Sequence, residues 1–542
     1  MANNFVDPKQ YAGYHSDKMT FVQQDKELHD TKFETKPISY LRGCWNRFAK
    51  NKGSIVAGVI LLLILSFAII APFTTSRTVD WNDPNYQFVL PKAPLFEGTG
   101  FWDGTEQKRV YETEYLIIDN YETEDKPIRQ LISEGQEKSL VPGEYDKYYV
   151  VRYDTYAVGA KQFSVSDSEY QSILDWESKH EGRKVLLPIV LSEPNADYPN
   201  SPDVRTFVED YVDTLIAENK LIAASRANFI NSIKNLYVNA NRYYKVECVL
   251  NRGRATTTCR PSFDENGKIR DLYCVDNNGD YVYALNDTSS GAQKTIRVDY
   301  NVYYEYKYGA KCVYLFGASP IGHDIFVRLA SGARLSLLLG VSVSLINLLI
   351  GLLWGSISGY YGGTVDLIME RVTDILSAIP FVIMATLFQL HLAPKAGPIP
   401  SLLFAFVVTG WIGTAATTRM QFYRFKNQEY VLASRTLGAK DLRLIFVDIL
   451  PNAIGTLITS SVLMIPGVIF SESSLSYLNI IDLSNSNITS VGTLLNEGSS
   501  FLASYPHMVL FPAIFISILM ISFNLIGNGL RDAFNPTLRG EE

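Results

Sequence analysis

Apolar runs long enough to cross a bilayer occur once near the start of the chain and five times in its second half. A membrane-spanning helix needs about 20 mainly apolar residues. The runs cover residues 55–72, 335–359, 368–391, 399–418, 452–471 and 508–530. They predict six transmembrane helices. Between residues 73 and 310 the apolar runs are too short to span, so this segment is predicted to be a domain inserted after the first helix, here called the inserted domain.

Within the inserted domain, strand-like stretches such as "KYYVVRYDTYAV" alternate with helix-like stretches such as "YQSILDWESKH". This pattern predicts an α+β fold. Most of the 33 Tyr residues of the chain fall here, and acidic residues outnumber basic ones. Nucleic acid is therefore not expected as a partner. Its residues show no spacing typical of a metal site or of a catalytic nucleophile.

Two cysteines of the inserted domain, Cys248 and Cys259, are equidistant from a predicted turn at Gly253 and Arg254. In a hairpin they would face each other across the two strands, close enough for a disulfide. Two buried thiols are the alternative, and four of the five Cys residues fall in this region or at its edge.

Basic residues near the span ends predict the orientation, because cytoplasmic loops keep Lys and Arg. They precede the first span, separate the fourth from the fifth and follow the sixth, whereas residues 472–507 contain none. Both termini are therefore predicted to be cytoplasmic, with residues 1–54 as an N-terminal cytoplasmic segment and residues 73–310 outside. The first span is expected to be a retained anchor, because its leader is too long for a signal peptide and no A-x-A site follows.

The predicted spans contain a helix-packing pattern but no motif that would supply energy for transport. Gly351, Gly355 and Gly359 form a doubled G-x-x-x-G pattern, which lets another helix approach closely. The spans carry no chain of acidic or His residues that would resemble a proton relay. The chain also lacks the G-x-x-x-x-G-K-[ST] loop that holds nucleotide phosphates. We therefore expect a non-enzymatic chain without a metal or cofactor, driven by another subunit.

Residues 429–451 interrupt the apolar pattern between the fourth and fifth spans. The stretch 429–437 favours a helix, Gly438 can end it in the left-handed conformation, and Asp441 can cap a second helix that runs to Leu450, before Pro451. Apolar side chains here would contact water unless a partner covered them. They are Tyr430, Val431, Leu437, Leu442, Ile445 and Phe446. A docking site for a partner is predicted, and a helix pair lying on the bilayer surface is the alternative.

The stretch "EYVLASRTLGAKDLRLIFVDILPN" resembles the EAA loop of binding-protein-dependent ABC importer permeases, specifically the C-type subunit of the dipeptide and oligopeptide family. Ala433 and Gly438 match the Ala and Gly of that motif, and Leu450 and Pro451 its end, whereas Leu432 and Ser434 depart from it. The resemblance implies an EAA coupling loop at 419–451 that inserts into an ATPase subunit. The residues expected to contact the ATPase are Glu429, Tyr430, Ala433, Ser434, Arg435, Leu437, Gly438, Ala439, Asp441, Leu442, Phe446, Leu450 and Pro451.

A second motif precedes the second span. Residues 316–340, "FGASPIGHDIFVRLASGARLSLLLG", are similar to a pattern of the same family. Ser319 and His323 depart from that pattern. Shorter matches lie at 359–363, 378–380, 472–478 and 523–539. The matching residues singled out as a family site are Gly317, Gly322, Asp324, Arg328, Gly332 and Arg334.

The resemblance implies the type I ABC importer permease fold, with six helices, in residues 311–542 together with the first span, whereas the inserted α+β domain at 73–310 has no counterpart in the short members of the family. It implies a bacterial cell-membrane subunit for import of di- or oligopeptides. The expected partners are a second permease in a heterodimer, two ATPase subunits that bind ATP and Mg²⁺, and an extracellular peptide-binding lipoprotein that the inserted domain helps to dock. Nickel or another small solute is an alternative cargo. A MacB-type exporter and a membrane receptor are less favoured alternatives.

Overall fold

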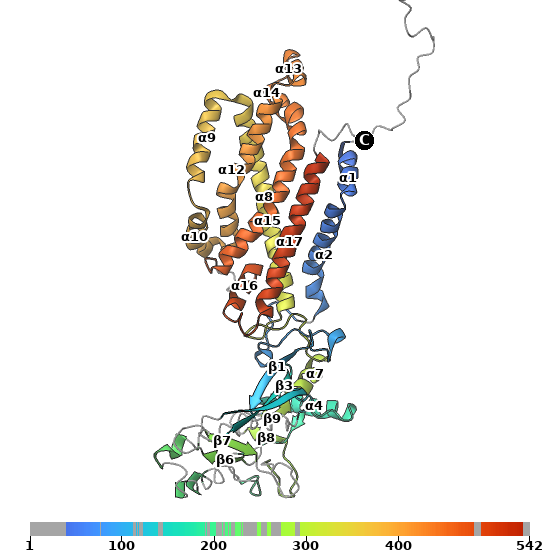
Figure 1. The fold of residues 1–542 in the computed structure, drawn as a ribbon, viewed down its shortest axis with the longest axis vertical. Helices are drawn as coiled ribbons and strands as arrows, with labels where there is room; N and C mark the ends of the chain where they lie inside the picture. The colour runs from blue at the N-terminus through green and yellow to red at the C-terminus, as the bar shows by residue number, and fades with distance from the viewer. Residues whose placement is uncertain are drawn as a thin grey trace, which may run out of the picture.

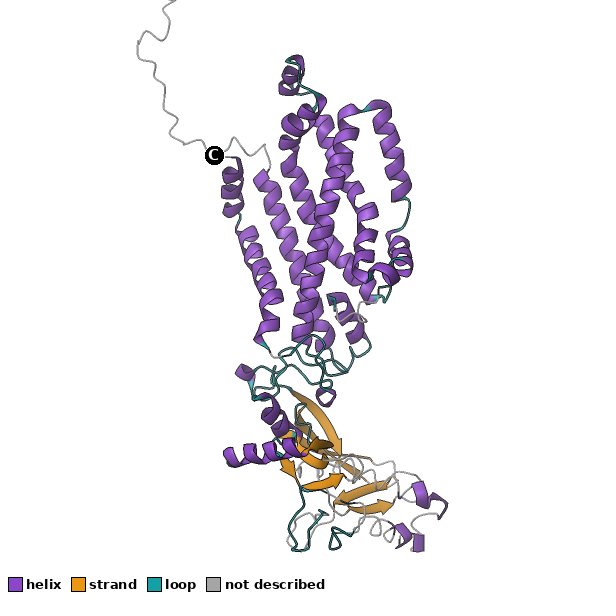
Figure 2. Cartoon of the chain, turned by 180° about the vertical axis from the view of Figure 1, so that it is seen from behind, coloured by secondary structure: helices purple, strands orange, loops and turns teal. Residues whose placement is uncertain are grey.

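The computed structural model contains a bundle of long helices with a domain of strands and short helices at one end (Figure 1, Figure 2). The structure describes residues 40–534, apart from residue 76, most of 112–122, 139–144, most of 190–195, most of 202–245, 251–256, 262–272, 288–292 and 482–488.

Five helical segments are long and apolar enough to cross a membrane. Each coincides with a predicted span and is made of residues with little charge. They are α2 (Lys52–Thr74), α8 (Ile325–Tyr361), α12 (Pro398–Phe425), the continuous segment Asp441–Tyr477 that includes α15 (Leu450–Tyr477), and α17 (His507–Phe534). Shorter helices are α1 (Tyr40–Lys50), α11 (Ala393–Ala396) and α16 (Val491–Ser499).

The predicted span at 368–391 is not one continuous helix. It falls on α9 (Gly363–Ser377) and α10 (Phe381–His391), which are bent by 73° at a break of three residues. Pro380 lies in that break, and a proline disfavours the helical conformation of the residue before it and has no N–H to donate. The two helices count as one span only if the bent pair crosses the membrane as a unit.

Helix α8 lies at the centre of the bundle and packs on α12 through its glycines. A Cβ on Gly351 would lie 2.6 Å from Thr414 Cβ, and one on Gly355 would lie 2.3 Å from the Ala415 carbonyl oxygen. The G-x-x-x-G pattern thus allows close approach between two helices of the same chain. On its other side α8 joins a buried cluster with α2, α15 and α17, which includes Leu337, Ile469 and Leu519.

The inserted domain contains antiparallel sheets and short helices, in keeping with its α+β pattern. One sheet has the order β1-β3-β2, formed by Thr105–Tyr111, Tyr145–Asp154 and Ile128–Lys138. A second has the order β4-β9-β5, with β8 also paired to β9, and consists of Ala160–Ser166, Gln293–Asp299, Leu186–Leu187 and Ala284–Asp287. Helices α4 (Asp167–Lys179) and α7 (Tyr300–Tyr308) accompany this second sheet, and α4, α7 and both strands β4 and β9 share a buried apolar cluster.

The predicted hairpin is present as β6 (Val246–Leu250) and β7 (Thr257–Pro261). Its register pairs Cys248 with Cys259, as the spacing around the turn predicts. Whether the two sulfurs are joined stays a prediction, because their side chains lie outside the described residues. Cys274 and Cys312 are buried free thiols. Burial raises the pKa of Cys312 to about 12, which keeps this thiol protonated at neutral pH.

The inserted domain is seated on the ends of α8 and α17. The guanidinium of Arg77, which follows α2, donates to Asp324 Oδ2 at 2.8 Å and to the Val313 carbonyl at 2.7 Å. Asp324 in turn caps α8 by accepting from the Phe326 N–H. Trp102, from the inserted domain, packs against Phe511 of α17 with ring centroids 5.5 Å apart.

Candidate functional site

Residues 429–451, here called the coupling segment, lie at the end of the bundle opposite the inserted domain (Figure 1). Helix α13 (Glu429–Thr436) is followed by Leu437 and then by Gly438, whose φ of +84° is the left-handed conformation that the sequence predicts. A second helical stretch starts with α14 (Asp441–Arg443). The segment is therefore two helices joined by a bend at Gly438.

The second helix differs from the prediction in its extent. It does not stop near Leu450 but continues through a π-helical turn, η6 (Leu444–Ile449), directly into α15. Pro451 follows this turn and cannot donate the α-helical hydrogen bond to the residue four positions earlier, which explains the widened turn before it. The coupling segment is thus continuous with a bundle helix.

Part of the apolar surface expected to be exposed is buried instead. Val431 and Ile445 were predicted to need a partner to cover them, but the chain itself buries both, with Tyr360, Phe422 and Leu444, in one cluster. The helical periodicity of the segment turns these two side chains toward the bundle. The apolar side chains that are exposed are Tyr430, Leu432, Leu437, Leu442, Phe446 and Val447. Leu437 has 88% of its surface exposed and Leu442 has 69%.

Tyr360, at the end of α8, contacts both helices of the coupling segment. Its hydroxyl donates to Asp441 Oδ1 at 2.6 Å and accepts from Arg435 at 3.5 Å. Asp441 was predicted to cap the second helix, and this is wrong: the cap position is Lys440, and the Asp441 carboxylate binds Tyr360. A nearby tyrosine hydroxyl competes with the backbone N–H groups for this carboxylate.

An ion pair beside this contact joins the neighbouring helices. Arg419 of α12 donates two hydrogen bonds of 2.6 Å to Asp366 of α9, and the Tyr423 hydroxyl adds a third at 2.7 Å. Lys426 donates to the Gly359 carbonyl at 2.9 Å. Charged hydrogen bonds therefore join α8, α9 and the end of α12 directly before the coupling segment.

The remaining predicted coupling residues lie around the same bend. Glu429, Ala433, Arg435 and Pro451 are exposed, whereas Ser434 is half-buried. Ala439 and Leu450 pack on the buried cluster that contains Tyr360. The structure thus brings all of these residues to one end of the bundle, with an exposed apolar side and a buried anchoring side.

The second predicted group lies at the other end of α8. Gly317 and Gly322 have φ values of +80° and +82°. A Cβ on Gly322 would lie 1.9 Å from the Asp83 carbonyl oxygen, so only glycine fits. These two glycines let the chain before α8 pass close to the start of the inserted domain. The motif around Gly317 and Gly322 therefore contributes to the contact between the inserted domain and α8, at the end of α8 opposite the coupling segment.

The α8 residues of this motif connect α8 to α16. Arg328 donates to Glu497 Oε1 at 2.8 Å and to the Thr489 hydroxyl at 3.1 Å. Gly332 packs on the backbone of Ser490 and Val491 at the start of α16. Arg334 is exposed. A buried Glu472 also lies here and accepts from Ser336 at 2.9 Å.

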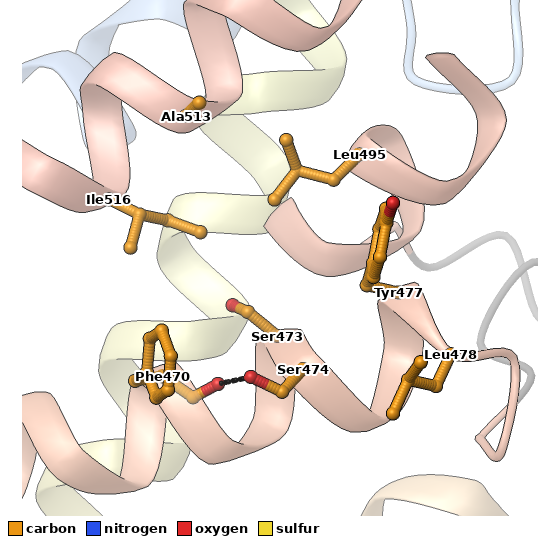
Figure 3. A pocket seen from close by; sticks show the side chains of 8 residues that line it. All are labelled: Phe470, Ser473, Ser474, Tyr477, Leu478, Leu495, Ala513 and Ile516. Carbon is orange, nitrogen blue, oxygen red and sulfur yellow. Dashed lines mark hydrogen bonds between the residues drawn. The ribbon is translucent and has the colours of Figure 1, made fainter. Parts of the chain in front are cut away.

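A hollow of about 460 Å³ opens on the side of the bundle between α15, α16 and α17 (Figure 3). Its lining is mostly apolar, with Phe470, Leu495 and Ile516 among the residues drawn. It contains no residue of the coupling segment. No cluster of three or more His, Cys, Asp or Glu side chains suited to a metal ion occurs among the residues that the structure describes.

Comparison with known proteins gives the family. Residues 351–540 match the model described as binding-protein-dependent transport system inner membrane component, and residues 39–94 match the N-terminal TM domain of oligopeptide transport permease C. The chain is 46% identical over 224 residues to the oligopeptide transport system permease protein OppC of Bacillus subtilis, covering 41% of this chain and 72% of the relative. This chain belongs to the oligopeptide and dipeptide permease family of ABC transporters.

Two further relatives belong to the same permease family. The dipeptide transport system permease protein DppC of Bacillus subtilis is 41% identical, with 41% of this chain and 69% of the relative covered. The OppC protein of Escherichia coli is 34% identical, with 41% and 72% covered. A solved structure of the inward-facing MetNI methionine ABC transporter aligns with 38% of this chain and 96% of its own, at a TM-score of 0.30 and 15% identity.

Sequence reasoning singled out Asp324 but missed its partner Arg77, and at the other end of α8 it missed Tyr360. Tyr360 lies in the matched stretch "GYYGG", but nothing local in the sequence links it to Asp441, 81 positions away. Arg77 and Asp324 are 247 positions apart. The sequence signal that could have indicated Arg77 is its position as a single cation directly after the first span.

Proposed function

We propose that this permease is one membrane subunit of an ATP-driven importer for di- or oligopeptides. It forms the translocation pathway with a second permease, and two separate ATPase subunits hydrolyse ATP on Mg²⁺. The chain itself has no catalytic role and binds no cofactor. The observation that carries the proposal is the coupling segment, which exposes apolar side chains while Tyr360 and the buried cluster fix it to the bundle.

The proposed topology has six spans, with the bent pair α9 and α10 as the third. Both termini and the coupling segment face the cytoplasm of a bacterial cell, and residues 73–310 lie outside. The Lys and Arg distribution supports this orientation. The separation of the coupling segment and the inserted domain to opposite ends of the bundle is consistent with it (Figure 1).

Peptide as cargo is supported by the relatives, whose names refer to oligopeptide and dipeptide transport. An extracellular peptide-binding lipoprotein completes the proposed assembly, and the inserted domain lies where such a protein would approach the bundle. In the proposed mechanism, closure of the ATPases moves the coupling segment. Because that segment continues directly into α15, its movement is transmitted to the bundle.

Leu437 gives a direct test of ATPase docking. We expect Leu437→Asp to weaken binding of the ATPase subunits by about 10- to 100-fold, because burial of a leucine side chain at an interface is worth roughly 1.5–3 kcal/mol. Co-purification of the ATPases with the permease pair measures the effect. The matched control is Leu95→Asp in the inserted domain, where the leucine is 87% exposed.

Leu95→Asp is expected to leave ATPase binding unchanged. Equal ATPase recovery with Leu437→Asp and wild type would refute the proposed docking surface. Peptide-stimulated ATP hydrolysis by the reconstituted complex tests the cargo, and stimulation by nickel in place of peptides would refute peptide import.

A further inference from the structure

Two adjacent cavities in the inserted domain have charged linings. One has a volume of about 340 Å³ and the other about 350 Å³. Lys92, Glu97, Arg129 and Asp154 line both, so the two cavities are neighbours, and together they are here called the charged cleft. Each part is at the lower end of the range of about 300–1,000 Å³ that is typical of small-molecule sites. The cleft extends from strands β1, β2 and β3 to Lys311, Cys312 and Val313, close to the start of α8.

The floor of the charged cleft is already neutralised by the protein. Asp154 is 2% exposed and accepts from Arg129 at 2.6 Å and 3.0 Å and from the Tyr156 N–H at 2.9 Å. The Lys92 ammonium lies 3.7 Å from Asp154 and 4.8 Å from the Tyr156 ring centroid. Asp103 accepts from the backbone N–H groups of Gly100 and Thr105. These groups therefore shape the cleft and have little unused charge for a ligand.

Two charges of opposite sign remain at the rim. Within the part of the chain that the structure describes, neither the Glu97 carboxylate nor the Arg152 guanidinium forms a direct ion pair, and the nearest opposite charges are Arg129 for Glu97 and Asp103 for Arg152. Arg152 makes one long hydrogen bond of 3.4 Å, to the Gly98 carbonyl. Both side chains line the same 350 Å³ part of the cleft. A cation alone or an anion alone would use one of them and repel the other, whereas a ligand with separated ammonium and carboxylate groups can pair with both.

We propose that the charged cleft binds a short zwitterionic peptide, with its amino terminus at Glu97 and its carboxylate at Arg152. The inserted domain then provides a binding site for cargo next to the mouth of the bundle. The choice of a peptide as the zwitterion rests on the proposed function. The placement of the two opposite charges stands independently of it.

The test measures binding of trialanine to the full-length chain in lipid nanodiscs, without ATPases or binding protein, by isothermal titration calorimetry. Trialanine is expected to bind, and N-acetyl-trialanine and trialanine amide to bind at least tenfold more weakly, because each lacks one terminal charge. Glu97→Gln and Arg152→Gln are each expected to weaken trialanine binding about tenfold. Glu97→Gln should also remove the preference for a free amino terminus, and Arg152→Gln the preference for a free carboxylate.

Glu134→Gln and Arg226→Gln are the controls, because these charges, the first exposed and the second half-buried, belong to the inserted domain but line neither cavity. Both are expected to bind trialanine as wild type does. Absence of trialanine binding to wild type, equal binding of the blocked peptides, or unchanged binding by both cleft variants would overturn the proposal. Uptake by the complete transporter is measured separately. Uptake without binding to the cleft refutes this inference alone, and binding without uptake refutes the proposed function alone.

Discussion

At the scale of single residues, the hydroxyl of Tyr360 is the contact that unites the coupling segment. It is bonded to Asp441 in the second short helix and to Arg435 in the first, while its ring is buried at the end of α8. The hydrogen bond to a carboxylate is of the stronger, charge-assisted kind. One hydroxyl thus holds both helices in register with the bundle.

Tyr360→Phe removes that hydroxyl and keeps the ring. We expect the variant to assemble with its ATPases and to hydrolyse ATP, but to import several-fold less peptide per ATP, because a hydrogen bond to a charged group contributes roughly 1.5–3 kcal/mol. The ratio of peptide uptake to ATP hydrolysis in proteoliposomes measures this. Tyr361→Phe is the control, since the exposed neighbour has no such contact with the coupling segment, and an unchanged ratio in Tyr360→Phe would contradict the assigned role.

The raised pKa of Asp299 predicts that the stability of the inserted domain depends on pH. Burial raises its pKa from 3.8 to about 6, although backbone N–H groups of Glu124 and Asn301 donate to it. The folded state therefore keeps a proton that the unfolded chain loses, so stability is highest below about pH 4 and falls as the pH rises through about 6. The loss amounts to roughly 3 kcal/mol.

Asp299→Asn should lack this contribution while the side-chain oxygen still caps α7. Hydrogen exchange of the α7 amides in the full-length chain, corrected for the intrinsic rate, gives the free energy of opening from pH 4 to pH 7. The difference between wild type and variant isolates Asp299 from other titrating groups. A difference that does not change with pH would exclude the raised pKa.

At the scale of elements, the glycines of α8 determine how closely α12 can approach. Gly355→Ala places a methyl group 2.3 Å from the Ala415 carbonyl oxygen, which is backbone and cannot move aside. We expect a loss of about 1–3 kcal/mol in stability, measured as a lower midpoint of thermal unfolding in nanodiscs. Gly413→Ala in α12 is the control, because a methyl group there would have no neighbour within 4 Å, and we expect no loss. Equal midpoints of thermal unfolding for Gly355→Ala and wild type would show that α8 and α12 can move apart without a loss of stability.

The elements also show which features follow from sequence. Long apolar runs identify α2, α8, α12, α15 and α17, because burial in lipid needs only length and composition. Gly438 ends α13 as predicted, since a left-handed residue after a helix favours glycine. The bend between α9 and α10 was not predicted, although Pro380 is visible, because a proline marks a break but not its angle.

The tertiary contacts of the site could not be predicted. Val431 and Ile445 are apolar like their exposed neighbours, and only the position of the bundle decides which of them it covers. The sequence predicted that the Asp441 carboxylate would accept from nearby backbone N–H groups. Its partner is instead the hydroxyl of Tyr360, which lies 81 positions away in the chain. Local patterns therefore located the coupling segment, and long-range packing fixed its orientation.

At the scale of the whole molecule, the buried pair of Arg77 and Asp324 joins the inserted domain to the bundle. Both side chains are at most 10% exposed. We expect Arg77→Met to destabilise the full-length chain by about 3–5 kcal/mol, because the Asp324 carboxylate stays buried without its partner. Thermal unfolding in nanodiscs, together with protease cleavage between the inserted domain and α8, measures the effect.

The double variant Arg77→Met with Asp324→Asn should recover part of that loss. Asparagine can still cap α8 but carries no charge to leave unpaired. If the double variant were no more stable than Arg77→Met, electrostatic pairing would not be what seats the inserted domain.

The single helix α8 carries both attachments, Asp324 before its first turn and Tyr360 in its last. Its 37 residues extend roughly 55 Å and contain no proline, so the two ends cannot tilt independently. In the proposed mechanism, a movement of the coupling segment would therefore also move the inserted domain at the other end of α8. In the proposed topology this domain lies outside the cell, where a fluorescent tag on it would report each transport cycle.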